Sequence, residues 1–194
     1  MSETIDTIRT DHQNFRRVLE ALQSVIDNLG YPPTRRELDI MYSAVYYMRV
    51  FPDRHHHPKE ERYVLAALRD ACPDCGSLLS DIEKEHAQSV EILKQIEALL
   101  EGLEKGASQD IKPLQAIVRE YVRQQGQHMR REERELLPLA EQHLSMSDWE
   151  RINAAFRSDR DPLFQDRIDQ GFDAMAQRLV DMADDLRRTG PPAI

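Results

Sequence analysis

Residues 56–65 read HHPKEERYVL, and residues 128–137 read HMRREERELL. The two segments share a histidine, a basic residue, the run Glu-Glu-Arg and a final leucine at the same offsets. Asp11-His12 and Glu85-His86 form a second matching pair, because apolar residues follow both at equivalent positions. The sequence therefore predicts an internal repeat of one helical hairpin, with a pseudo-twofold relation between the two halves of the chain.

Apolar residues recur every three or four positions in four segments, the pattern of amphipathic helices with one buried face. These segments cover residues 5–29, 38–48, 79–103 and 114–139, and the second continues through HHHPKEER at residues 55–62. Helix-breaking residues separate them, at Gly30 to Pro33, Cys72 to Gly76 and Gly102 to Asp110. Since the connections are short and no segment alternates like a strand, the sequence predicts an all-α, up-down-up-down four-helix bundle.

Two prolines, Pro52 and Pro58, interrupt the second of these segments. Proline removes a backbone donor, so we expect a kink or wide turn near Arg49 to Asp53 that can shift the buried face by one residue. Two registers then compete. In one His56 and Glu60 face the core, and in the other His57 and Glu61 do. The repeat favours the first, because His128 and Glu132 have the same i,i+4 spacing.

Histidines occupy in-phase core positions in all four segments, and two segments add a glutamate one turn later. Buried carboxylates without a partner are costly, and no Lys or Arg lies on these faces to neutralise them. Cations in the core would do so, and imidazole with carboxylate suits Fe, Zn, Ni or Cu. The ligands are too many for one tetrahedral ion, so the sequence predicts a dinuclear site in which an oxo or hydroxo bridge supplies further negative charge.

These motifs, with Leu136-Leu137-Pro138 after the second, resemble the hemerythrin-like, or HHE cation-binding, family over about residues 1–145. The resemblance implies a hemerythrin-like four-helix bundle with a non-haem di-iron centre, in which zinc could substitute for iron. It implies seven metal ligands: His12, His56, His86 and His128 as terminal ligands, Glu60 and Glu132 as bridges, and His57 as a further ligand to the second iron.

Oxygen-carrying members of that family have a second histidine one turn from the third-helix ligand, but this chain has Ile82 and Val90 there. We therefore expect a metal-binding protein that binds O₂ or NO as an oxygen or redox sensor, or that serves as an iron reservoir. One alternative is a di-iron enzyme handling ferrous iron, peroxide or NO, including iron–sulfur cluster repair. Another is a metal-free helical interaction module.

The charge balance excludes several other classes of function. The 194 residues include 26 Lys or Arg and 35 Asp or Glu, for a net charge of −9 without a basic run. Nucleic acids and membrane surfaces are therefore not expected partners.

No apolar stretch approaches the ~18 residues of a membrane span. The first residues, MSETIDTIRTDHQ, lack the pattern of a signal peptide, which favours a cytoplasmic location.

Two pairs of residues lie outside the repeat. Cys72 and Cys75 could form a redox dithiol or half of a zinc site, but there is no second CxxC, and the residues between them favour a simple turn. His55 and His143 are out of phase with the core and are expected to face solvent.

Residues 146–194 follow the bundle as a helical extension. Ser147 could cap a short helix with Glu150 as its partner, and Asp159 to Pro162 should end that helix. A last helix then has a heptad stripe: Ile168, Phe172, Met175, Leu179, Met182 and Leu186. This stripe would either pack across the bundle or pair with a second chain to form a homodimer.

Overall fold

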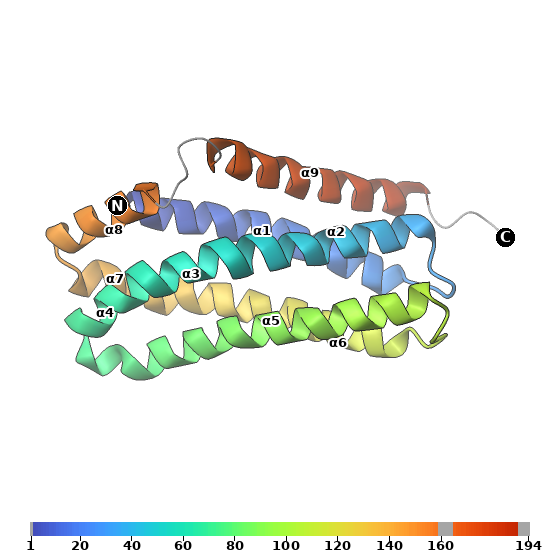
Figure 1. The fold of residues 1–194 in the computed structure, drawn as a ribbon, viewed down its shortest axis with the longest axis horizontal. Helices are drawn as coiled ribbons and strands as arrows, with labels where there is room; N and C mark the ends of the chain where they lie inside the picture. Colours follow the sequence, from blue (N-terminus) through green and yellow to red (C-terminus); the bar gives the residue numbers. More distant parts are fainter. Residues whose placement is uncertain (1, 159–164, 190–194) are drawn as a thin grey trace.

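The computed structural model describes residues 2–158 and 165–189, except for the side chains of residues 158, 165–170, 172 and 189. Most of these residues are helical and no strand occurs among them, which confirms the predicted all-α class. The four-helix bundle consists of four rods, each a continuous run of helix (Figure 1).

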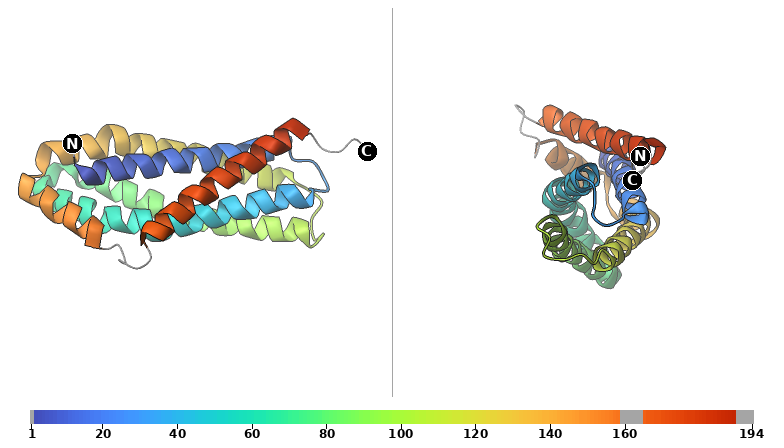
Figure 2. Two further views of the ribbon diagram at one scale, coloured as in Figure 1. Left: turned by 90° about the horizontal axis from the view of Figure 1, so that it is seen from above. Right: turned by 90° about the vertical axis from the view of Figure 1, so that its right-hand side faces the viewer.

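The first rod is α1 (Glu3–Asn28) and the third is α5 (Gly76–Glu104), preceded by the 3₁₀ turn η3 (Pro73–Cys75). The second and fourth rods include π-helical segments. The second contains α2 (Arg35–Phe51), η1 (Pro52–His56), α3 (His57–Lys59), η2 (Glu60–Leu65) and α4 (Ala66–Ala71). The fourth contains α6 (Lys112–Arg131), η4 (Glu132–Leu136) and α7 (Leu137–His143). Two further helices follow the bundle, α8 (Met146–Ser158) and α9 (Gln165–Thr189). Viewed end-on, the four rods lie around a common axis and α9 lies outside them (Figure 2).

The π-helical segment η1 begins within the range Arg49 to Asp53, where a kink or wide turn was predicted, whereas η2 and η4 were not predicted. Pro58 follows η1 by two residues, and Pro138 follows η4 by two residues. Since proline has no N–H, the carbonyl four residues earlier loses its α-helical partner, and the backbone can widen there. Wide turns of this kind are frequent at functional sites. Here they bring both His56 and His57 to the buried side of one rod.

Side-chain caps fix where two helices begin. The Glu37 backbone N–H donates to Thr34 Oγ1 at 3.3 Å, and the Glu37 carboxylate accepts from the Thr34 backbone at 2.6 Å, so α2 starts after the prolines. The predicted cap of α8 at Ser147 was wrong by two residues. Ser145 and Asp148 form the reciprocal pair instead, at 3.2 Å and 2.9 Å, because Asp148 lies three residues after Ser145.

The apolar core is divided into two clusters by a layer of polar side chains. One cluster, between α1, α2, α5, α6 and α9, includes Phe15, Tyr47 and Leu100. The other lies toward the end of the bundle formed by α4 and α7, and includes Ile8, Leu68 and Leu136. The histidines and glutamates predicted to bind metal lie in the layer between the clusters.

The last helix packs along α1 and α2 of its own chain (Figures 1 and 2). Leu179 is 2% exposed, and the small residues Ala176 and Ala183 beside it let the helix approach closely. Asn14 also donates to Asp173 at 2.6 Å. The side chains of Ile168 and Phe172, and the expected break at Asp159 to Pro162, lie outside the described residues. A homodimer through this helix therefore stays a prediction.

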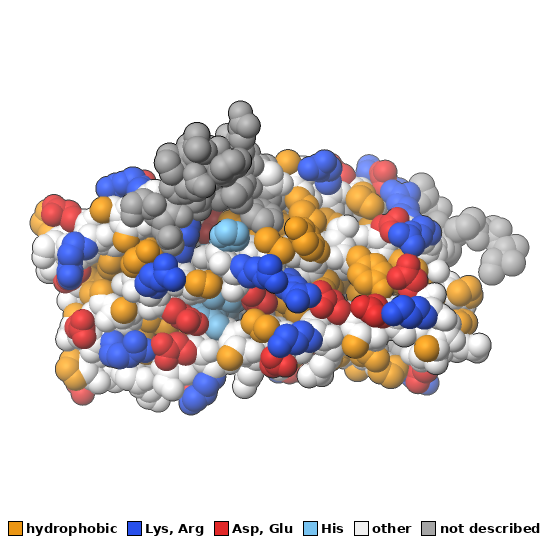
Figure 3. Space-filling model, viewed as in Figure 1, with side chains coloured by type: hydrophobic (Ala, Val, Ile, Leu, Met, Phe, Trp, Pro, Cys, Tyr) orange, Lys and Arg blue, Asp and Glu red, His pale blue; other side chains and the backbone are white. Residues whose placement is uncertain are grey.

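Among the described residues, no helix has the length and hydropathy that a membrane span requires. On the face drawn in Figure 3, acidic and basic side chains are interspersed, with small areas of histidine between them.

We expect Leu179→Ala to lower the free energy of unfolding by about 2–5 kcal/mol, because it leaves a cavity between α9 and the bundle. Val180→Ala, on the half-buried neighbouring position, should cost less than about 1 kcal/mol. Urea unfolding of both variants measures the difference. Equally small losses would mean that α9 does not pack on α1 in solution.

Candidate metal centre

All seven predicted ligands lie in the polar layer between the two apolar clusters, and every one of the four rods contributes at least one of them. Their exposed fractions lie between 0% and 4%, and the two glutamates are fully buried. The contributions are His12 from the first rod, His56, His57 and Glu60 from the second, His86 from the third, and His128 and Glu132 from the fourth.

Glu132 lies between histidines of three rods. Its Oε2 is 3.1 Å from Nε2 of His12, whereas its Oε1 is 3.3 Å from Nε2 of His128 and 3.5 Å from Nε2 of His86. The two oxygens of one carboxylate therefore face different histidines.

Glu60 has the equivalent position from the second rod. Its Oε1 is 3.4 Å from Nε2 of His56, and its Oε2 is 3.8 Å from Nε2 of His86. Two carboxylates, each with one oxygen toward either side, are suited to bridging two cations.

The histidines divide into two groups around these carboxylates. Ligand atoms of His57, His86 and His128 lie within 4.8 Å of one another, and so do those of His12, His56 and Glu60. The rings of His57 and His86 are stacked, with centroids 4.0 Å apart. One side of the centre thus has three histidines and the other has two.

The buried atoms of this layer fit bound cations. Nε2 of His56, His86 and His128 and all four oxygens of Glu60 and Glu132 are buried without a hydrogen-bond partner in the described part of the chain. Such atoms are costly to bury unless something binds them. Imidazole nitrogens and carboxylate oxygens that converge in this way are typical ligands of divalent transition metals.

Four carboxylates hold the outer nitrogens of four histidines. The Nδ1 atoms lie 2.7–3.0 Å from carboxylate oxygens, in the pairs His12–Glu133, His56–Asp11, His86–Glu61 and His128–Glu85. A proton on Nδ1 then donates to the carboxylate, and Nε2 remains an unprotonated ligand directed to the centre.

These four pairs form a closed ring around the bundle. Asp11 connects the first rod to the second, and Glu61 connects the second to the third. Glu85 then connects the third rod to the fourth, and Glu133 connects the fourth back to the first. Each rod supplies one carboxylate and receives one.

The roles of these four carboxylates were not predicted from the sequence, although a signal for them exists. Asp11 and Glu85 each precede a histidine of the buried layer, and Glu61 and Glu133 each follow one of its glutamates, at equivalent positions of the repeat. The rival register is also resolved, because the Glu60 side chain is 0% exposed whereas that of Glu61 is 41% exposed.

A fifth carboxylate breaks the symmetry between the halves. Asp53 Oδ1 lies 3.4 Å from Nδ1 of His57 and accepts a hydrogen bond from Ser89 at 3.1 Å, and burial raises the pKa of Asp53 to about 6. The equivalent positions in the second half are Gln125 and Met129. The repeat therefore gave no signal for Asp53.

The electrostatics differ among the histidines of this layer. Burial by itself lowers the pKa of His86, but the nearby carboxylates of Glu132 and Glu61 outweigh burial and raise that pKa to about 9. For His57, burial and the charges of His86 and His128 act together and hold the pKa well below 6.5. At neutral pH, His57 is thus unprotonated while His86 carries a proton that a metal must displace.

A family model described as the hemerythrin HHE cation-binding domain matches residues 3–140. That span includes all seven predicted ligands and the four carboxylates behind them. No curated protein and no solved structure matches the chain.

We expect Glu61→Ala to weaken metal binding by about 10–100-fold, because His86 loses the carboxylate that orients it. Glu141→Ala, which removes an exposed carboxylate of α7, is the matched control and should leave the affinity unchanged. Competition with a chromophoric chelator measures both. Equal affinities in the two variants would contradict a role of the outer carboxylates.

Metal binding should also become tighter as the pH rises. Because the pKa of His86 is raised to about 9, this histidine is protonated at neutral pH, and a metal must displace the proton. The affinity for the metal should therefore increase with pH up to about pH 9, where His86 loses its proton. Calorimetry of Zn²⁺ binding in two buffers of different protonation enthalpy counts the protons released. An affinity that does not change between about pH 6 and pH 9 would contradict this assignment.

Proposed function

The chain belongs to the hemerythrin HHE cation-binding family, and we propose that it is a non-haem di-iron protein that binds O₂ or a related small ligand such as NO. Its role would be that of an oxygen or redox sensor, or of an iron reservoir. The observation that carries the proposal is the pair of buried glutamates whose oxygens face two different groups of histidines.

The residues fit two iron ions. Glu60 and Glu132 would bridge them, with His57, His86 and His128 on one ion and His12 and His56 on the other. Two divalent cations would neutralise the two buried carboxylates, which have no Lys or Arg beside them among the ion pairs of the described residues. Bound iron would supply the ability to take and return electrons and to bind a diatomic ligand.

The protein itself would orient the histidine ligands and shield the metal centre from bulk water. The outer carboxylates fix four imidazole rings, and the apolar clusters on both sides of the layer keep bulk water away. Because the side with His12 and His56 has fewer protein ligands, we place the small ligand there.

A di-iron enzyme is the second candidate, and one feature favours it. A surface hollow of about 510 Å³ lies over His128, and its lining includes Gln88, Gln124, Gln125 and Arg131. It offers room for a polar molecule larger than O₂. A binder would form a reversible adduct, whereas an enzyme would consume its substrate.

We expect protein produced with iron and purified without chelator to hold about two iron ions per chain, as two bridging carboxylates require. Glu60→Ala combined with Glu132→Ala should abolish that content. Elemental analysis measures it, and exposing the reduced protein to O₂ and then removing the gas distinguishes a reversible adduct from turnover.

The control for this experiment replaces the exposed carboxylates Glu20 and Glu141 with alanine, which should leave the iron content unchanged. If the double alanine variant fails to fold, the pair Glu60→Gln and Glu132→Gln keeps the volume and removes the charge. Folded wild-type protein that takes up no stoichiometric iron would overturn the proposal.

A further inference from the structure

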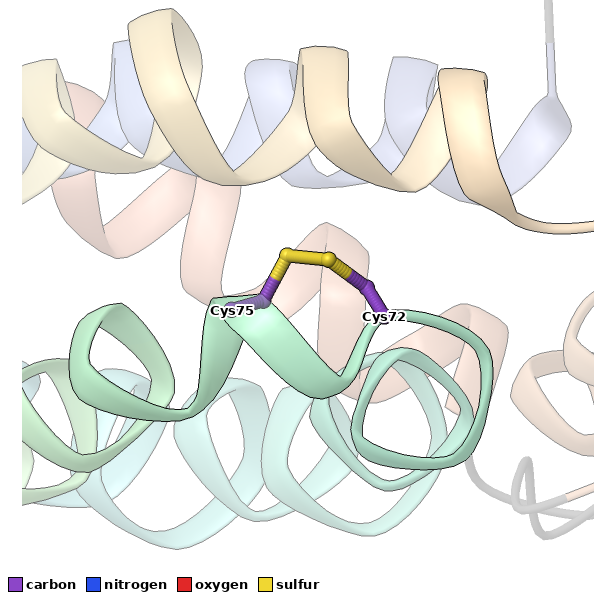
Figure 4. The surroundings of a disulfide bond; sticks show 2 residues. All are labelled: Cys72 and Cys75. Carbon is purple, nitrogen blue, oxygen red and sulfur yellow. A yellow bond between two sulfur atoms is a disulfide. The ribbon is translucent and has the colours of Figure 1, made fainter.

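A second group of metal-ligating side chains lies away from the centre, at the end of the bundle formed by α4 and α7. Cys72 and Cys75 form a disulfide across the turn η3 (Figure 4), and the sulfur atoms lie on the inner side of this turn. A nitrogen of His143, the last residue of α7, lies within 4.8 Å of both sulfur atoms.

We propose that Cys72, Cys75 and His143 form a redox-controlled site for a thiophilic divalent cation such as Zn²⁺, open when the cysteines are reduced and closed by their disulfide. The sequence supplied only half of such a site, because it has one CxxC pair. The fold supplies the third ligand from a residue almost seventy positions later.

The geometry is close to what zinc requires. The ligand atoms around one tetrahedral zinc ion lie about 3.5–4 Å apart, so sulfur and nitrogen atoms already within 4.8 Å need only small movements. The 3₁₀ turn holds both cysteines on one side, where the Cys75 N–H donates to the Cys72 carbonyl at 3.0 Å. Two thiolates and an imidazole form a donor set that zinc favours over hard cations.

Burial and charge also suit a neutral metal complex. Cys72 and Cys75 are 5% and 6% exposed and belong to the apolar cluster that includes Leu68 and Leu79. Two separate thiolates would be costly there, but together with one Zn²⁺ they carry no net charge. His143 is exposed, so an ion can reach the site from solvent and a water molecule can complete its coordination.

The redox step is a thiol–disulfide exchange. Two molecules of a small thiol reduce the Cys72–Cys75 bond to two thiols and leave as one disulfide, and the protein thiols then lose two protons when the cation binds. Oxidation by the reverse exchange would expel the ion.

The two metal sites are separate. Cys72 follows Glu60 by twelve residues along the second rod, which corresponds to roughly 18 Å of helix. The buried centre has only nitrogen and oxygen ligands, so an optical signal from a metal–thiolate bond reports on the cysteine site alone.

Cobalt(II) added to the reduced, metal-free full chain is the test. We expect a thiolate-to-cobalt charge-transfer absorption that Zn²⁺ abolishes by competition. The band should be absent from the oxidised protein and from the variant with Cys72→Ser and Cys75→Ser, while both still bind cobalt at the buried centre.

The third ligand is tested by His143→Asn. This variant should lower the affinity of the cysteine site for Zn²⁺ by about 10–100-fold or more, because removing even an outer partner of a metal ligand causes a loss of that size. Gln142→Ala, on the exposed position before it, is the matched control. The proposal fails if the reduced chain gives no charge-transfer band, or if His143→Asn and Gln142→Ala bind Zn²⁺ equally.

Discussion

The structure depends on two negative charges placed in the middle of an apolar bundle. Glu60 and Glu132 are fully buried, and the layer that contains them divides the core into two clusters. Removing a carboxylate from water is unfavourable unless cations or hydrogen bonds compensate. Their surroundings follow from this constraint, because the layer places imidazole rings around both carboxylates and further carboxylates behind four of those rings.

The sequence predicted the bundle, the seven buried residues and the register of the second rod, because a duplicated hairpin compares one half with the other. His56 and Glu60 could be placed only by their match to His128 and Glu132, since the prolines make periodicity ambiguous. The sequence could not predict features that occur once. Asp53 pairs with a histidine whose counterpart is Met129, and His143 approaches the cysteines only through the folding of distant helices.

The last helix illustrates a different limit. Its heptad stripe predicted that a face is buried but left open what covers it. In the described part of the chain, that face packs on α1 and α2, where Ala176 and Ala183 allow close approach. A periodic pattern specifies the width and position of an apolar face, but small residues decide which surface can fit against it.

The ring of carboxylate–histidine pairs has a direction, and this has a consequence for how the chain folds. Viewed along the bundle axis, four similar helices can follow one another either clockwise or anticlockwise. Apolar packing alone distinguishes these two arrangements poorly. In the mirror arrangement each carboxylate would face the wrong neighbour, and four histidines would lose their partners. The ring that orients these histidines therefore also favours one handedness of the bundle, so that residues of the candidate metal centre help to specify the topology.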